Sequence, residues 1–169
     1  MDENLIEKID HYTIKKTVNK GFIDVNKTWF EYYSQLSKNN KYLVKIFTMD
    51  AKTNSFTMEN LGEVISVEQC LKQSDKYITK KVLCDIILAL TKTWAQGIEF
   101  SKLLDNDKFF VHTDLSLCNI VMTKDNQIKV IDPDSYTIVE KLKFTEKFYM
   151  SQINLMSNIG IYYLSLIHI

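Results

Sequence analysis

The chain has 169 residues, of which 46% are hydrophobic and 25% are charged. These proportions are ordinary for a globular protein, so they exclude general intrinsic disorder, and the length predicts a single domain. The 21 basic and 21 acidic residues give a net charge of zero. No basic surface for binding nucleic acid is therefore expected.

All of these basic residues are lysines, so no guanidinium group is available to bind a phosphate or carboxylate in a bidentate way. The three cysteines, Cys70, Cys84 and Cys118, are widely separated and stand at no metal-type spacing. This pattern is typical of a reduced, cytoplasmic protein. The N-terminus has no apolar signal core, and apolar stretches such as 82–90 are too short to span a membrane.

Hydrophobic periodicity predicts strands and helices in separate groups, which indicates an α+β fold. Asn26 is a plausible N-cap for a helix in which Trp29, Phe30, Tyr33 and Leu36 recur at helical spacing. The expected elements are a strand at 12–18, a helix at 27–37, strands at 42–49 and 55–61 joined by a turn at 52–54, a short helix at 67–71, a longer helix after Thr79, and short strands at 109–111, 119–122 and 127–131. After residue 137 the helical signal is weak.

The long helix after Thr79 is expected to be amphipathic and to pack one face against the core. The residues predicted on that face are Val82, Leu83, Ile86, Leu90, Thr93, Trp94 and Ile98.

Residues 111–136 carry the most informative pattern in the chain. Asn119 follows Asp114 by five positions, and Asp132 stands at the end of a predicted strand, 18 positions after Asp114. The hairpin formed by 119–122 and 127–131 is expected to bring Asp132 and the loop containing Asp114 to the same end. Carboxylate and amide oxygens at one place suit Mg²⁺, which keeps several waters and is shared with substrate phosphates.

The pattern His-x-Asp-Leu-x-x-x-Asn-Ile followed by a strand ending in Ile-Asp resembles the catalytic core of the protein-kinase-like superfamily, which includes aminoglycoside and choline phosphotransferases. The resemblance implies a two-lobed fold and an ATP- and Mg²⁺-dependent enzyme that transfers a γ-phosphoryl group to an unidentified hydroxyl acceptor. It implies that Asp114 orients the acceptor hydroxyl and that Asn119 and Asp132 bind the metal. His112 is interpreted as a structural residue of the loop.

The resemblance extends upstream to two weaker sites. Lys15 would be the lysine that binds the phosphates, with Lys16 and Lys20 as rivals, and Glu31 would be its ion-pair partner. The segment 56–62 resembles the hinge between the lobes, where the backbone of Glu59 and Leu61 would bind adenine. A solvated lysine and an ordinary edge strand are the alternative interpretations.

The sequence departs from the family pattern at three places. No glycine precedes Lys15, so the Gly-rich phosphate loop is missing, and Thr113 stands where regulated protein kinases usually carry arginine. Asp132-Pro133-Asp134 replaces Asp-Phe-Gly, and Asp134 is either a further metal ligand or a turn cap. Of these, Thr113 and the Asp132-Pro133-Asp134 segment favour a small-molecule acceptor, whereas the missing Gly-rich loop favours a pseudokinase or binding module. A protein Ser/Thr kinase and a pseudokinase or binding module remain as alternatives.

The predicted organisation is an incomplete small, nucleotide-binding lobe at 1–61 and the first part of a helical catalytic lobe at 62–163. Residues 164–169 resemble the translation of a sequencing adaptor, so His168 is expected to carry no function. The small lobe is expected to be reduced and the large lobe incomplete. A non-functional fragment of a kinase is therefore a further alternative.

Overall fold

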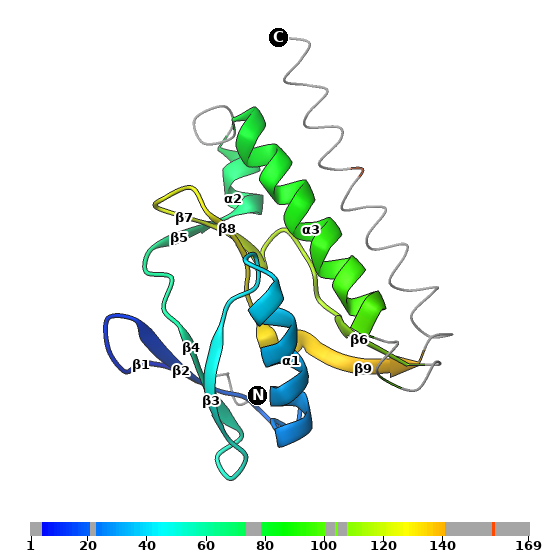
Figure 1. The fold of residues 1–169 in the computed structure, drawn as a ribbon. Coiled ribbons are helices and arrows are strands. Elements are labelled where there is room, and N and C mark those ends of the chain that lie inside the picture. The colour runs from blue at the N-terminus through cyan, green and yellow to red at the C-terminus, as the bar shows by residue number, and fades with distance from the viewer. Residues whose placement is uncertain are drawn as a thin grey trace.

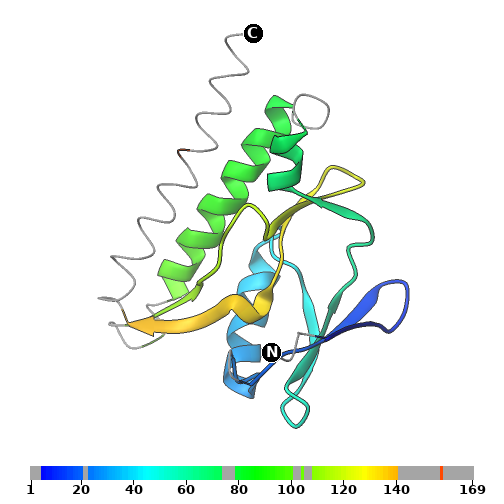
Figure 2. The same ribbon diagram turned by 180° about the vertical axis from the view of Figure 1, so that it is seen from behind.

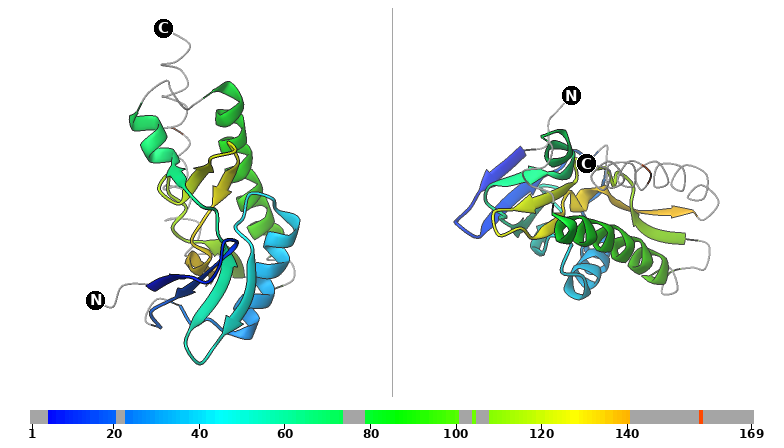
Figure 3. Two further views of the ribbon diagram at one scale, coloured as in Figure 1. Left: turned by 90° about the vertical axis from the view of Figure 1, so that its left-hand side faces the viewer. Right: turned by 90° about the horizontal axis from the view of Figure 1, so that it is seen from above.

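The structure is a computed structural model that describes residues 5–20, 23–73, 79–100, 104, 108–140 and 157. Within these residues the strands form three small antiparallel sheets, and the two longer helices lie side by side along one face of the molecule (Figures 1 and 3). The four-stranded sheet lies at one end, and the short helix α2 (Val67–Lys72) lies at the other.

The N-terminal sheet has four strands in the order β1-β2-β4-β3. These are β1 (Leu5–Lys8), β2 (Thr13–Thr17), β3 (Ile46–Asp50) and β4 (Ser55–Glu59). Neighbouring strands are antiparallel, so β2 has β1 on one side and β4 on the other. The predicted strands at 12–18 and 55–61 are confirmed. The one predicted at 42–49 begins later, at Ile46, and β1 was not predicted.

Helix α1 (Lys27–Asn39) connects β2 to β3 and confirms the predicted helix, with two more residues at its C-terminal end. Asn26 is the N-cap, since its side-chain oxygen accepts a hydrogen bond from the Trp29 N–H at 3.0 Å. This bond satisfies one of the free N–H groups of the first turn. Trp29, Tyr33 and Leu36 form the buried face, as their spacing predicts.

The second part of the chain begins with β5 (Val64–Ser66), which pairs with the hairpin of β7 (Ile120–Thr123) and β8 (Ile128–Val130) in the order β5-β7-β8. Helix α3 (Lys80–Phe100) follows α2 and runs along this sheet (Figure 1). Thr79 precedes α3 as predicted, and its hydroxyl oxygen accepts a hydrogen bond from the Val82 N–H at 3.2 Å.

A two-stranded sheet of β6 (Lys108–His112) and β9 (Tyr136–Glu140) completes the described fold. It lies across the lower end of α3 when the molecule is viewed from behind (Figure 2). Between β8 and β9 the chain makes a 3-10 turn, η2 (Pro133–Ser135). Neither β5 nor β9 was predicted: β5 has only three residues, whereas β9 has five and includes the β-branched run Thr137-Ile138-Val139, a local strand signal that was overlooked.

The buried face of α3 differs from the prediction at its C-terminal end. Ile98 is 45% exposed, whereas Gly97 and Phe100 are buried. A Cβ atom on Gly97 would lie 3.1 Å from the carbonyl oxygen of Phe110, so the glycine allows β6 to approach the helix closely. The set of α3 residues that is buried therefore depends on where β6 lies, and the sequence of the helix alone does not show this.

The N-terminal sheet and the second part of the chain are joined by backbone and side-chain contacts. The Val130 N–H donates to the Tyr42 carbonyl at 2.7 Å, and the Val44 N–H donates to the Val130 carbonyl at 3.2 Å. Lys129 in β8 forms an ion pair with Glu59 at 2.7 Å, with both side chains largely buried. One hydrophobic core runs through both parts.

The predicted division into 1–61 and 62–163 stays a prediction. Residues 164–169, including His168, lie outside the described residues, and so does nearly all of 141–163. Among the described helices, none is both long enough and apolar enough to span a lipid bilayer.

Candidate active site at the catalytic loop

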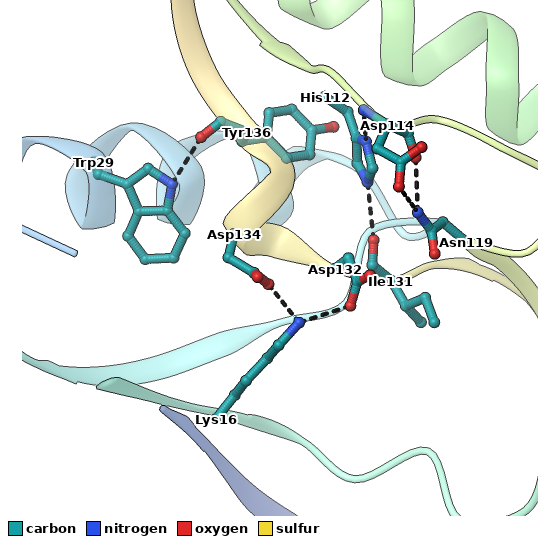
Figure 4. A network of polar contacts seen from close by, with 9 residues as sticks. All are labelled: Lys16, Trp29, His112, Asp114, Asn119, Ile131, Asp132, Asp134 and Tyr136. Atoms are coloured by element: carbon teal, nitrogen blue, oxygen red, sulfur yellow. Dashed lines mark hydrogen bonds and ion pairs between the residues drawn. The ribbon is translucent and has the colours of Figure 1, made fainter. Parts of the chain in front are cut away.

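The loop between β6 and β7 is folded around the side chain of Asn119. Its amide nitrogen donates to the Asp114 carbonyl oxygen at 2.7 Å and to the Asp114 carboxylate Oδ2 at 3.0 Å (Figure 4). The backbone adds two tight turns, with the Ser116 N–H bonded to Asp114 and the Asn119 N–H bonded to Ser116. Because the Asn119 nitrogen is used within the loop, its Oδ1 is the atom left to bind a ligand.

Asp132 stands one residue beyond Ile131, whose N–H donates to the Asn119 carbonyl at 2.9 Å. The hairpin therefore brings the end of β8 to the loop, as predicted. Asp132 has a left-handed backbone, with φ of 58°, which Asp tolerates better than most residues. This conformation starts η2, in which the Ser135 N–H bonds to the Asp132 carbonyl at 2.9 Å. The side chain of Asp132 is 36% exposed.

His112 connects the two segments from inside. Its Nδ1 accepts a hydrogen bond from the Asp114 N–H at 3.2 Å, and its Nε2 lies 3.0 Å from the Ile131 carbonyl oxygen. A carbonyl oxygen can only accept, so Nε2 carries the proton of a neutral imidazole. Burial lowers the pKa of His112, and the Ile131 bond and nearby carboxylates offset this in part. These contacts support its interpretation as a structural residue.

Lys16 in β2 reaches from the N-terminal sheet to this site (Figure 4). Its Nζ lies 2.8 Å from Asp132 Oδ1 and 2.7 Å from Asp134 Oδ1, and the lysine is buried. Burial by itself lowers the pKa of Lys16, but the two carboxylates outweigh it, so the pKa is raised overall. The ammonium group is therefore held in its charged form.

The structure brings neither Lys15 nor Glu31 to this site; the lysine that meets Asp132 and Asp134 is Lys16, which the sequence left as a rival of Lys15. Successive residues of a strand point to opposite faces, and Lys15 consequently faces away from Lys16. Glu31 is exposed on α1 and lies 3.7 Å from Lys27. The alternation of side chains along β2 could have identified the inward-facing lysine from the sequence. Lys16 lies on the same face of the strand as Ile14 and Val18, which pack in the core.

The segment after β4 is placed where the hinge was predicted, between the N-terminal sheet and β5. The Glu59 N–H is already bonded to the Lys45 carbonyl at 2.9 Å, and its carboxylate binds the Lys129 ammonium. The backbone N–H of Leu61 has no hydrogen-bond partner among residues 5–20, 23–73, 79–100 and 108–140. Of Glu59 and Leu61, therefore, Leu61 is the residue whose backbone N–H is left to bind a ligand.

The donor atoms at this site fit a hard divalent cation. Asp132 offers its second carboxylate oxygen and Asn119 its Oδ1, and both residue types are ligands that Mg²⁺ prefers. The described residues contain no group of three acidic, histidine or cysteine side chains that could enclose a metal. Two protein ligands suffice for Mg²⁺, because this ion keeps waters and shares substrate phosphates.

Three contacts at the site were not predicted from the sequence. Asp134 binds Lys16, and the Trp29 indole N–H donates to the Tyr136 carbonyl at 3.1 Å, which ties α1 to the start of β9. Thr113 donates its hydroxyl and its N–H to the Ser135 carbonyl, each at 2.9 Å. The sequence marked Thr113 and Asp134 as departures from the family pattern, but it gave no sign of their partners.

Comparison with known proteins gives structural but no sequence matches. No protein-family model matches the chain, and no curated protein matches it. The structure is similar to that of the kinase PK-1 of Cydia pomonella granulovirus, with a TM-score of 0.53 and 20% identity over 78% of this chain. The chain spans about half of that protein, 46% of its length.

A second similar structure is the choline kinase LicA of Streptococcus pneumoniae, with a TM-score of 0.47 and 14% identity. This comparison covers 95% of the present chain and 70% of the choline kinase. The granulovirus kinase is similar enough to establish the architecture at this level of identity. The chain therefore has an α+β, protein-kinase-like fold, with reduced lobes.

Proposed function

We propose that the chain is the nucleotide- and metal-binding part of an ATP- and Mg²⁺-dependent phosphotransferase that acts on a hydroxyl group. The observation that carries the proposal is the convergence of Asp114, Asn119, Asp132 and Lys16 in a protein-kinase-like fold. These groups come from three separate segments of the chain. No shared local structure explains why two carboxylates, an amide and a buried ammonium meet at one place.

Each side chain has a distinct role in this proposal. Asn119 and Asp132 hold Mg²⁺, which supplies charge neutralisation at the phosphates when it is bound. Lys16 contributes a buried positive charge on the side of the N-terminal sheet. Asp114 orients the acceptor hydroxyl and takes its proton as the oxygen bonds to the γ-phosphorus and the bond to the β-phosphate oxygen breaks, which releases ADP. Catalysis is then mainly positioning and electrostatic stabilisation.

A small-molecule acceptor is favoured over a protein. In the proposed enzyme the catalytic loop is fixed to η2 by Thr113, whose hydroxyl and N–H both bond to Ser135. A phosphorylated activation segment read by arginine is therefore not needed to order the loop, and no arginine is present to read one. The three cysteines are free thiols, which supports a cytoplasmic location.

A nucleotide-binding module without transferase activity is the second candidate. It is favoured by the turn between β1 and β2, residues 9–12, which contains no glycine, since a Gly-rich loop normally covers the phosphates in protein kinases. The two candidates share the metal and nucleotide site but differ in turnover.

The test measures binding of a fluorescent ATP analogue with and without Mg²⁺, together with ADP formation in the presence of amino alcohols and aminoglycosides. We expect Asp132→Asn to abolish the Mg²⁺-dependent part of ATP binding. Asp125→Asn, in the exposed β7–β8 turn, is the matched control and should bind as the wild type does. Unchanged Mg²⁺ dependence in Asp132→Asn would refute the metal assignment. Binding without ADP formation would favour the binding module.

A further inference from the structure

Lys16 is held by two carboxylates that differ in their surroundings. Asp132 and Asp134 both place Oδ1 within 2.8 Å of the ammonium nitrogen, but the side chain of Asp132 is 36% exposed and that of Asp134 is 9% exposed. A metal ion arriving from solvent can therefore reach Asp132, whereas Asp134 lies deeper, beside the lysine. The two acids are thus suited to different tasks.

Helix α1 does not supply a partner for this lysine. Glu31 is the single acidic residue in the helix, and it lies on the exposed side near Lys27. The buried residues of α1 are Trp29, Tyr33, Leu36 and Ser37, none of which carries a charge, and Trp29 bonds to the Tyr136 carbonyl. A buried ammonium needs a counter-ion, so its partner has to come from another segment.

The 3-10 turn η2 supplies that partner. Asp132 precedes Pro133 with a left-handed backbone, and the Ser135 N–H closes the turn onto the Asp132 carbonyl. This geometry turns the side chains of Asp132 and Asp134 to the same side, where both contact Lys16 (Figure 4). The proline fixes the backbone between the two acids, so their separation is set by the turn itself.

We propose that Asp134 is the positioning residue for Lys16: it holds the ammonium toward the phosphates in place of an acid from α1 and leaves Asp132 free to bind the metal. The inference rests on the proposed function and adds to it. When a divalent cation takes Asp132, Lys16 keeps one carboxylate partner and its position. Orientation of the lysine then depends on η2 and not on the placement of α1.

The main test is a double-mutant cycle between Lys16→Met and Asp134→Asn, read as affinity for the fluorescent ATP analogue with Mg²⁺. We expect each single variant to weaken binding about tenfold, as for the loss of one charge-assisted hydrogen bond, and the double variant to be no weaker than either. The direction of the change in Asp134→Asn distinguishes positioning from simple electrostatics, because removing a negative charge would by itself strengthen the binding of anionic ATP. Asp134→Glu should restore much of the affinity, and Glu31→Gln is the matched control.

A second readout separates positioning from metal ligation. Binding of Mn²⁺, followed by its electron paramagnetic resonance signal, should change less than about twofold in Asp134→Asn but be lost in Asp132→Asn. Loss of Mn²⁺ binding in Asp134→Asn would make Asp134 a metal ligand and overturn the proposal. Unchanged ATP binding in Asp134→Asn, or a tenfold loss in Glu31→Gln, would also overturn it.

A third readout is independent of ATP. Acetylation of Lys16 by an amine reagent, located by mass spectrometry, should be slow in the wild type, faster in Asp134→Asn and unchanged in Glu31→Gln. Equal rates in the wild type and Asp134→Asn would contradict the positioning role. A wild-type chain that binds no ATP would instead contradict the proposed function, while acetylation still tests the Lys16–Asp134 pair. Thermal melting of each variant confirms that it is folded.

Discussion

Replacing His112 tests whether the β6–β7 loop and the end of β8 are held together as the structure indicates. The ring is 2% exposed and carries one hydrogen bond on each nitrogen, to the Asp114 N–H and to the Ile131 carbonyl. His112→Leu keeps the approximate volume of the side chain but removes both partners. Two partly buried backbone groups would then lose these hydrogen bonds.

The expected cost follows from those two groups. A buried polar group that loses its partner costs about 1–3 kcal/mol, and because these two groups are only partly buried each should lie near the lower end of that range, so His112→Leu should reduce the free energy of unfolding by about 2–3 kcal/mol. His112→Asn keeps an acceptor near the position of Nδ1, and His112→Gln keeps a donor near that of Nε2. Each should therefore recover about half of the loss. The change is large compared with a typical domain stability of about 5–15 kcal/mol.

Acid should have a related effect through the same side chain. Because the pKa of His112 is lowered from 6.5 in the folded chain, the unfolded state binds the proton more readily as the pH falls below 6.5. The wild type should then lose about 1.4 kcal/mol per pH unit from this group until the folded-state pKa is reached. His112→Gln lacks this contribution, so its stability should fall less steeply between pH 6.5 and pH 5.

The measurement is urea unfolding followed by tryptophan fluorescence, at several pH values from 7.5 to 5. His11→Gln is the matched control, since His11 is exposed and its replacement should leave stability nearly unchanged. A loss below about 1 kcal/mol in His112→Leu would refute the account of two orphaned backbone groups. Equal acid slopes for the wild type and His112→Gln would refute the argument from the lowered pKa.

Three further predictions concern contacts that hold the site in place. Asn54 has φ of 49°, and its buried side chain makes three hydrogen bonds to the backbone. Asn54→Ala should therefore lower the free energy of unfolding by about 3 kcal/mol, and by more than Asn54→Gly does, because glycine relieves the backbone strain. Equal losses for the two variants would contradict the strain argument. Lys129→Met should lower the free energy of unfolding by about 2 kcal/mol, because Glu59 loses its ion-pair partner. An unchanged midpoint in urea unfolding would show that this ion pair does not link the N-terminal sheet to the second part of the chain. Trp29→Phe keeps an aromatic ring but removes the hydrogen bond to the Tyr136 carbonyl. Thermal melting should show that the free energy of unfolding falls by about 1 kcal/mol. Wild-type stability in this variant would mean that the bond does not hold α1 to β9.

Local sequence was sufficient for the elements that have a pattern of their own. The N-cap Asn26 and the buried face of α1 were predicted because capping and helical periodicity act within a few residues. The loop from Asp114 to Asn119 and the β7–β8 hairpin were predicted for a similar reason. Their spacing along the chain is short, so it determines that the loop and Asp132 meet at one end.

Elements that depend on distant partners were missed or misplaced. Strand β5 has only three residues and is defined by its pairing with β7. Strand β9 is different, since its five residues include three β-branched side chains and carried a local signal that was overlooked. The buried face of α3 includes Gly97 because β6 packs against the helix there, and the hydrophobic periodicity of the helix does not predict this contact. Such cases follow from β pairing and packing, which are properties of the assembled fold.

The identity of the lysine at the site shows the same division most clearly. The sequence by itself suggested a phosphate-binding lysine at Lys15, with Lys16 and Lys20 as rivals and a solvated lysine as the alternative. Only the tertiary structure shows which lysine meets the acids, because the pairing of β2 with β4 sets which face of the strand is covered, and this places Lys16 beside Asp132. The tertiary structure also supplies the counter-ions, since a buried ammonium takes those that the fold brings to it: here these are Asp132 and Asp134, the latter from a turn 118 residues away.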